Sequence, residues 1–333
     1  LVGSEMCIRD RDKTAVRRNA GNCRSSRFFR AVQEGNMYRI RKVLNHNAAI
    51  VIGMEDNGEY LLMGKGVGFG KKTGERVEAG PETTAYCLQQ LTDRGDAKEI
   101  IKSVSPVCLE LANEVLNEAE RVFGRIDRSI LFPMADHMEY AVRRIKNREQ
   151  ISNPLTEDIR LLFHREYKVA QSVQPLLWER MKVKIDEHEI GYIALHVHAA
   201  IEDEKVSQAM QIARAVRECV TLVEQQTGMK IDVMSLAYNR LMNHVRYMVA
   251  RALSGERLKL NMNDYMRVKF PEAYETAAVI CEEIGRSLNR KLDDVETGYL
   301  AMHIERVKDD ETTGSANNKA KKTTEEYHAG CDH

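Results

Sequence analysis

The chain of 333 residues has few aromatic side chains, no cysteine pairing pattern and no long apolar run. Its seven cysteines are odd in number and scattered without a Cys-x-x-Cys pair, which argues against a disulfide framework or a structural zinc site. Aromatic residues make up 6% with a single tryptophan, which favours aliphatic helix packing over an aromatic-rich β-sandwich. No apolar run approaches the roughly 20 residues that span a bilayer. We therefore expect a mainly helical, cytoplasmic protein without stable membrane insertion.

The formal net charge of zero conceals an uneven distribution of charge along the chain. Residues 1–36 hold eight basic and four acidic side chains, and residues 37–80 hold seven and five. The net charges of these segments are +4 and +2, so residues 81–333 carry −6. A basic N-terminal segment followed by an acidic remainder favours nucleic-acid binding by the N-terminal segment.

The two ends of the chain are not patterned like the rest. Residues 1–36 show neither helical nor strand periodicity, whereas a well-patterned segment begins directly after Met37. We expect translation to begin at Met37 and residues 1–36 to be a non-native or disordered leader, with a genuine basic arm as the alternative. The polar composition of residues 313–333 predicts a disordered tail.

Short β-branched runs follow Met37. Tyr38–Leu44 and Ala48–Ile52 are separated by Asn45-His46-Asn47, and Asp56–Glu59 supplies a hairpin turn before Tyr60–Met63. These runs predict an antiparallel meander. Because 44 residues give only a thin core, we expect this module to need a partner chain.

Glycine occupies every second position from Gly64 to Gly70. In a strand this spacing would leave one face bare for close approach by another backbone, with Lys65, Val67 and Phe69 on the other face. Lysine can bind phosphates and an exposed phenylalanine can stack on a splayed base, so the segment favours nucleic-acid binding. The alternative is a strand that packs tightly on a second sheet, with Phe69 in the core.

The second half of the chain repeats itself at an offset of 107 residues. Asp186–Val197 aligns with Asp293–Ile304, and the same offset relates His137, Tyr140 and Arg144 to their counterparts in the second copy. Amphipathic runs such as 108–122 and 209–226 have helical spacing, and the two Gly-Tyr-x-Ala-x-His segments fit helix starts. The repeat predicts two tandem all-α domains.

Each copy contains two histidines 59 residues apart, His137 with His196 and His244 with His303. A single histidine on an apolar helix is usually a packed residue, but the repetition indicates a shared role. Metal binding, general acid–base catalysis and phosphoryl acceptance could each use such a pair. Metal binding is weakened by the lack of nearby cysteines and of a ligand motif, and the possible further ligand His198 is replaced by Glu305 in the second copy.

An acidic residue also recurs early in the corresponding helices of both copies, as Glu189 and Glu296. An acid at this position usually compensates the helix dipole.

These motifs together resemble one family, the BglG/LicT-type transcriptional antiterminators of the bacterial sugar phosphotransferase system. The motifs are 42–47, 63–72, Asp136-His137 and the twin Gly-Tyr-x-Ala-x-His segments. The resemblance covers about residues 37–310. It implies a small antiparallel β RNA-binding domain at 37–94, followed by helical-bundle regulatory domains at 100–206 and 207–312.

The resemblance also implies the functional residues. The RNA-contacting positions would be Lys42, Asn45, Asn47, Gly64, Lys65, Gly66 and Phe69. The phosphorylation positions would be His137, His196, His244 and His303. Family members usually have three asparagines where this chain has Asn45-His46-Asn47, which leaves the role of His46 open.

The mechanism that the resemblance implies is a switch. A homodimer would clamp a leader-mRNA hairpin and prevent terminator formation. The phosphocarrier HPr or a sugar-specific transporter component would phosphorylate the histidines and repack the regulatory domains. Phosphorylation of the first domain would silence the protein and that of the second would activate it. The resemblance implies no enzyme activity, cofactor or metal.

Two other classes of protein stay open at this point. One is an enzyme with paired histidines, either a metal-dependent hydrolase or a histidine phosphotransferase. The other is a DNA-binding activator with the same regulatory domains, which would carry a helix-turn-helix head in place of the strands.

Overall fold

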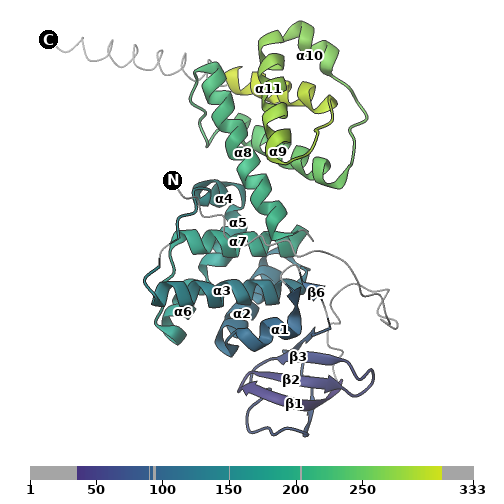
Figure 1. Cartoon of the computed structure of the whole chain (residues 1–333), viewed down its shortest axis with the longest axis vertical. Coiled ribbons are helices and arrows are strands. Elements are labelled where there is room, and N and C mark those ends of the chain that lie inside the picture. Colours follow the sequence, from purple (N-terminus) through teal and green to yellow (C-terminus); the bar gives the residue numbers. More distant parts are fainter. Residues whose placement is uncertain (1–35, 90, 93–94, 150, 203–204, 310–333) are drawn as a thin grey trace, which may run out of the picture.

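The computed structural model describes residues 36–89, 91–92, 95–149, 151–202 and 205–309. The predicted leader, apart from Asn36, and the predicted tail lie outside these residues. Along the chain a small β-sheet is followed by two groups of helices, and α8 (Val206–Thr227) extends from the first group into the second (Figure 1).

The N-terminal part is one five-stranded sheet in the order β4-β1-β2-β3-β5, antiparallel throughout. Its strands are β1 Met37–Asn45, β2 Ala48–Gly53, β3 Glu59–Met63, β4 Arg76–Glu78 and β5 Thr84–Cys87. Asn57 has a φ of 54° in the turn between β2 and β3, where Gly58 N donates to Asp56 Oδ1 at 2.9 Å. The predicted meander and its hairpin turn are confirmed.

The glycine-rich segment is not a strand, so that part of the prediction is wrong. Residues 65–70 form consecutive turns, in which the N–H groups of Val67 and Phe69 donate to the carbonyls of Gly64 and Gly66. Gly66 and Gly70 have φ values of 74° and 66°, a conformation that favours glycine. Val67 is buried while Phe69 is 67% exposed, so these two side chains do not share a face.

The two faces of the sheet pack in different ways. One face forms its own small core, which Val67 completes. The other face contributes Ala48, Leu61, Met63 and Tyr86 to the core of the helices. We expected a partner chain to supply this packing surface, and in the structure the helices of the same chain cover it.

Polar contacts also fix the sheet to the helices. Tyr86 Oη donates to Asn113 Oδ1 at 2.6 Å, and Arg128 Nη2 donates to Tyr86 Oη at 3.0 Å. Lys98 Nζ lies 2.7 Å from Glu59 Oε2 on β3. A short ladder between β6 (Leu91–Thr92) and β7 (Gly95–Asp96) leads into the first helix.

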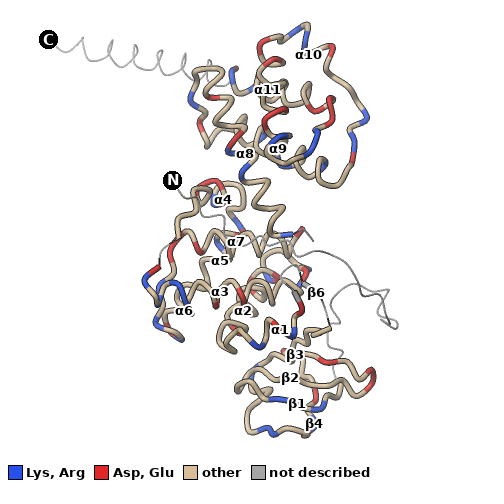
Figure 2. The backbone as a smooth tube through the Cα atoms, in the orientation of Figure 1, with Lys and Arg blue, Asp and Glu red and all other residues tan. Residues whose placement is uncertain are grey.

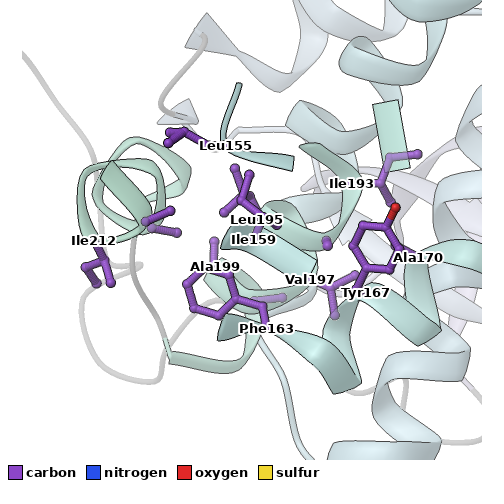
Figure 3. Packing of buried hydrophobic residues seen from close by; sticks show 14 of the residues in the cluster. Leu155, Ile159, Phe163, Tyr167, Ala170, Ile193, Leu195, Val197, Ala199 and Ile212 are labelled. Atoms are coloured by element: carbon purple, nitrogen blue, oxygen red, sulfur yellow. The ribbon is translucent and has the colours of Figure 1, made fainter. Parts of the chain in front are cut away.

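The first group of helices contains both segments that carry His137 and His196. Its elements are α1 Ala97–Ser103, α2 Pro106–Phe123, the 3-10 turn Arg128–Ile130, α3 Leu131–Lys146, α4 Thr156–Leu162, α5 His164–Gln171, α6 Val173–Met181 and α7 Glu187–Glu202. α7 begins four residues before Gly191, one turn earlier than the sequence suggested. Apolar residues of α4, α5 and α7 pack together in its core, including Ile159, Phe163 and Leu195 (Figure 3).

The second group of helices carries the second histidine pair, His244 and His303. It contains α9 Leu236–Ser254, α10 Asn263–Lys269, α11 Pro271–Ser287 and a helix over residues 295–309. α8 packs against α4 and α7 of the first group and against α9 and α11 of the second. Among the described residues, no helix has the length and apolar character needed to cross a membrane.

Candidate functional sites

The turn between β1 and β2 and the glycine turns form one surface, which we call the rim (residues 45–47 and 64–69). Asn45 Oδ1 accepts a hydrogen bond from Asn47 N at 2.9 Å. Asn47 in turn accepts from Gly66 N through Oδ1 and from Gly64 N through its carbonyl oxygen, each at 3.0 Å. Asparagine side chains thus fix the glycine turns to the sheet.

Gly68 is a rim residue that the sequence did not single out on its own. Its N–H donates to the carbonyl of His46 at 2.9 Å, and a Cβ at this position would overlap the carbonyl oxygen of Asn45. The close backbone approach that the bare glycines suggested therefore occurs here. Beside it, the rings of His46 and Phe69 meet edge to face with centroids 5.3 Å apart.

The rim and the neighbouring part of β1 carry exposed cations, and the rim also contacts a carboxylate. Lys42 on β1 and Lys65 on the rim are exposed, and Figure 2 shows Lys and Arg along β1. Asn45 Nδ2 donates to Glu110 Oε1 of α2 at 2.6 Å. Of the seven expected RNA-contacting positions, six lie on the rim and Lys42 lies three residues before it.

The first histidine pair lies between α3 and α7. The ring centroids of His137 and His196 are 5.4 Å apart. His137 Nε2 lies 3.1 Å from Glu189 Oε2, and Arg144 Nη2 donates to the other oxygen of Glu189 at 2.7 Å. Burial raises the pKa of Glu189, but His137 and Arg144 outweigh it and hold that pKa below its usual value.

The second pair repeats this arrangement between α9 and the helix over 295–309. The rings of His244 and His303 stack with centroids 4.8 Å apart. His244 Nε2 lies 3.9 Å from Glu296 Oε2, and Arg251 donates to both oxygens of Glu296 at 2.6 and 2.8 Å. The sequence repeat is therefore also a repeat of side-chain geometry.

The histidines of the second pair are weak bases. Burial, with a contribution from the nearby His303 and Arg251, lowers the pKa of His244 to about 3. Burial, then Arg306 and Arg240, lowers the pKa of His303 to about 4. At neutral pH both rings are therefore neutral, and each retains a nitrogen lone pair that can act as a nucleophile.

Glu189 and Glu296 do more than compensate a helix dipole. Both are buried and each is held by an arginine of the facing helix. The sequence contained a signal for this, because His137 and Arg144 are seven residues apart, as are Glu189 and His196. Seven residues are two helical turns, so each pair lies on one face of its helix.

His198 has a different environment from the paired histidines. Its Nδ1 lies 3.0 Å from Glu166 Oε1, and its ring packs against Phe163 with centroids 4.1 Å apart. Across the described ranges, no three His, Cys, Asp or Glu side chains gather closely enough to hold a metal ion.

Comparisons with known proteins match the β-sheet and both groups of helices. The model for the CAT RNA binding domain matches residues 38–90, and that for the PRD domain matches residues 109–200 and 217–307. Protein GlcT of Staphylococcus haemolyticus is 30% identical over 271 residues, covering 80% of this chain and 95% of that protein. Transcription antiterminator LicT of Bacillus subtilis is 26% identical, covering 81% and 98%. The crystal structure of GlcT CAT-PRDI is 27% identical with a TM-score of 0.43, covering 50% of this chain and 98% of that one.

Proposed function

Because the chain belongs to the BglG/LicT-type family of transcriptional antiterminators, we propose that it binds a leader-mRNA hairpin as a homodimer and prevents the overlapping terminator from forming. The family consists of transcription regulators rather than enzymes, and its members contain an RNA-binding domain and PRD domains. The hairpin, the dimer and the control by phosphorylation are the parts that we propose for this chain.

The observation that carries the RNA-binding proposal is the exposed ring of Phe69. A phenylalanine that is 67% exposed contributes little to the core, and the part of its ring away from His46 is open to stack on an unpaired base. It lies on a rim that hydrogen bonds hold in place, so little conformational entropy is lost on binding. Its exposure and the rigidity of the rim support the proposal that the ring stacks on a base.

The other proposed positions have distinct roles. Lys42 and Lys65 are exposed cations that can bind phosphates. Gly66 faces open space where a Cβ would stand, so RNA can approach the turns there, while Gly64 packs closely against Thr83 of the same chain. Asn47 holds the rim through its contact with Gly66, and Asn45 lies at its edge with its amide bonded to Glu110 and Asn47.

Regulation would act through His137, His196, His244 and His303. We assign them as acceptors of phosphoryl groups from HPr or from a sugar-specific transporter component, in the cytoplasm. A phosphoryl group adds about −2 of charge beside Glu189 or Glu296, which are themselves carboxylates. The repulsion would rearrange the helices that carry the histidines, silencing the protein through the first domain and activating it through the second.

A DNA-binding activator with the same regulatory domains would need a helix-turn-helix head. The described residues 37–87 form antiparallel strands and turns instead, which supports an RNA-binding head.

The test is titration of the full chain with a labelled hairpin from the leader upstream of its operon. We expect specific binding that weakens steeply as salt rises. A hairpin with a scrambled loop and equal length is the control for non-specific attraction. Equal affinity for the two hairpins at moderate salt would exclude specific leader recognition.

The regulatory part needs a separate test, namely phosphotransfer to His137→Ala and His244→Ala. Each change should reduce labelling of its own domain and alter antitermination in a reporter strain. Unchanged labelling and unchanged antitermination in both variants would refute the switch.

A further inference from the structure

The helices that carry the second histidine pair lie side by side and run in opposite directions. Arg251 of α9 contacts Glu296, and His244 of α9 contacts His303. From the first contact to the second, the residue number falls by seven on α9 and rises by seven on the helix over 295–309. The two contacts are therefore successive positions along an antiparallel helix pair, two turns apart.

The next position along this pair holds two arginines. Arg240 lies one turn before His244 on α9, and Arg306 lies three residues after His303. Residues three or four apart share a helix face, so both arginines lie at the end of the pair beyond the histidines. Both are exposed, and neither makes an ion pair with another residue of the described part of the chain.

The charges of both arginines act on His303. They add to burial in lowering the pKa of that ring, as expected for two guanidinium groups close to it. His303 is also only half-buried, whereas His137, His196 and His244 are buried. Its Nδ1 is buried without a hydrogen-bond partner, so Nε2 is the nitrogen that a donor can reach.

The first repeat lacks this feature. The residues equivalent to Arg240 and Arg306 at the offset of 107 are Pro133 and Ala199, which are buried and uncharged. An acid, Asp136, also precedes the first histidine of that repeat, where the second repeat has the neutral Asn243. The two repeats therefore differ in charge at the place where a phosphoryl donor would approach.

Two like charges at one helix–helix contact repel each other unless an anion lies between them. We propose that Arg240 and Arg306 receive the phosphoryl group delivered to His303 and hold it there, so that His303 is the preferred acceptor of the chain. This inference rests on the proposed regulation by phosphorylation and names the residues that direct it.

The transfer is balanced without a further reactant. The lone pair of His303 Nε2 forms a bond to phosphorus while the N–P bond of the donor's phosphohistidine breaks, and the electron pair of that bond stays on the donor nitrogen. Each ring keeps the proton on its other nitrogen. The incoming group carries about −2 of charge, which the two guanidinium groups can neutralise through paired N–H donors.

The test is time-resolved labelling of the full chain by a phosphocarrier protein that carries phosphohistidine. The label on the peptide that contains His303 is read by mass spectrometry under alkaline conditions. Arg240→Gln and Arg306→Gln should each slow labelling of His303 about tenfold, because each removes a charge-assisted contact to the phosphoryl group. Arg306→Lys should recover part of the rate, since it keeps the charge but not the planar fork.

Arg290→Gln is the matched control, because it removes an exposed arginine of the same repeat away from this end of the helix pair. It should leave the rate unchanged. The thermal midpoints of Arg240→Gln and Arg306→Gln should not fall, because removing either arginine relieves repulsion, whereas a purely structural role would lower them.

The outcomes separate this inference from the proposed function. If no histidine is labelled by any donor, regulation by phosphorylation fails and the inference fails with it. Labelling of His303 at wild-type rate in Arg240→Gln and Arg306→Gln would overturn the inference alone. Faster labelling of His137 or His196 than of His303 would also overturn it.

Discussion

Arg251 donates two hydrogen bonds to Glu296, from Nε to Oε1 at 2.6 Å and from Nη2 to Oε2 at 2.8 Å. The side chains are 15% and 4% exposed, so this ion pair is largely shielded from water. Arg144 contacts Glu189 through Nη2, while its Nε is buried without a hydrogen-bond partner. The arginine thus makes one more hydrogen bond to the carboxylate in the second repeat than in the first.

Breaking this pair should destabilise the second repeat. Arg251→Gln leaves a buried carboxylate without its partner and should lower the free energy of unfolding by about 3 kcal/mol. The double change Arg251→Gln with Glu296→Gln should cost less, because it leaves no buried charge. Urea unfolding followed by circular dichroism measures both. Arg286→Gln removes only exposed pairs and should leave the midpoint unchanged, and a double variant no more stable than the single one would contradict this account.

Acidification should destabilise the second repeat before the carboxylates titrate. The pKa of His244 is about 3 in the folded chain, below the roughly 6.5 of an unfolded chain. As the pH falls below about 6.5, the unfolded chain takes up a proton that the folded chain does not. The free energy of unfolding therefore falls with pH, by up to about 1.4 kcal/mol per pH unit for this group. Unfolding midpoints between pH 7.5 and 5 should show a smaller slope in His244→Gln than in the wild type.

Replacing Phe69 should separate RNA binding from folding. Phe69→Ala should weaken hairpin binding by about ten- to a hundredfold, because one stacked base contributes about 1–3 kcal/mol. The melting temperature should not change, since the ring is exposed. Val67→Ala is the matched control, because it truncates a buried side chain two residues away and should lower the melting temperature. Wild-type affinity in Phe69→Ala would remove the ring from the RNA interface.

The glycines of the turns over residues 65–70 should differ in their tolerance of alanine. Gly68→Ala places a Cβ against the carbonyl oxygen of Asn45 and should displace the glycine turns, with loss of both stability and RNA binding. Gly70→Ala meets open space and carries only the cost of a φ of 66°, about 1 kcal/mol. Comparing the melting temperatures of the two variants checks this order, and equal losses would contradict it.

Glu110 should oppose RNA binding. Its carboxylate accepts a hydrogen bond from Asn45 and brings negative charge to the rim. Glu110→Gln should therefore raise hairpin affinity several-fold at low salt, and the gain should shrink at high salt. Glu114→Gln is the control, because Glu114 pairs with the same Arg180 but contacts no rim residue among those described. An equal gain in both variants would point to overall charge instead of the contact with Asn45.

Much of this architecture could be predicted from local patterns. Alternating β-branched residues and the Asp56-Asn57-Gly58 turn determine the meander, and the offset of 107 residues reveals both histidine pairs. The glycine turns could not be predicted in the same way, because glycine at every second position is compatible with a strand and with left-handed turns. Tertiary contacts with the turn between β1 and β2, those of Gly68 with His46 and of Gly66 with Asn47, select the turns.

The role of the buried glutamates depended on partners far away in sequence. Glu189 has the position of a dipole-compensating acid, and its spacing of seven residues from His196 shows only that the two share a helix face, not which arginine holds the carboxylate. Its actual partner, Arg144, lies 45 residues earlier and reaches it only because α3 packs on α7. Likewise, the covering of Leu61 and Met63 by helices depends on where the sheet docks.

α8 has a consequence for how this protein can be recombined. One part of this continuous helix packs on α4 and α7, and another part packs on α9 and α11. A chimera that exchanges the second repeat at residue 207 would therefore bring a foreign helix face onto the first repeat. Because both repeats pack on α8, a functional exchange has to transfer α8 together with the helix surfaces of both repeats that contact it.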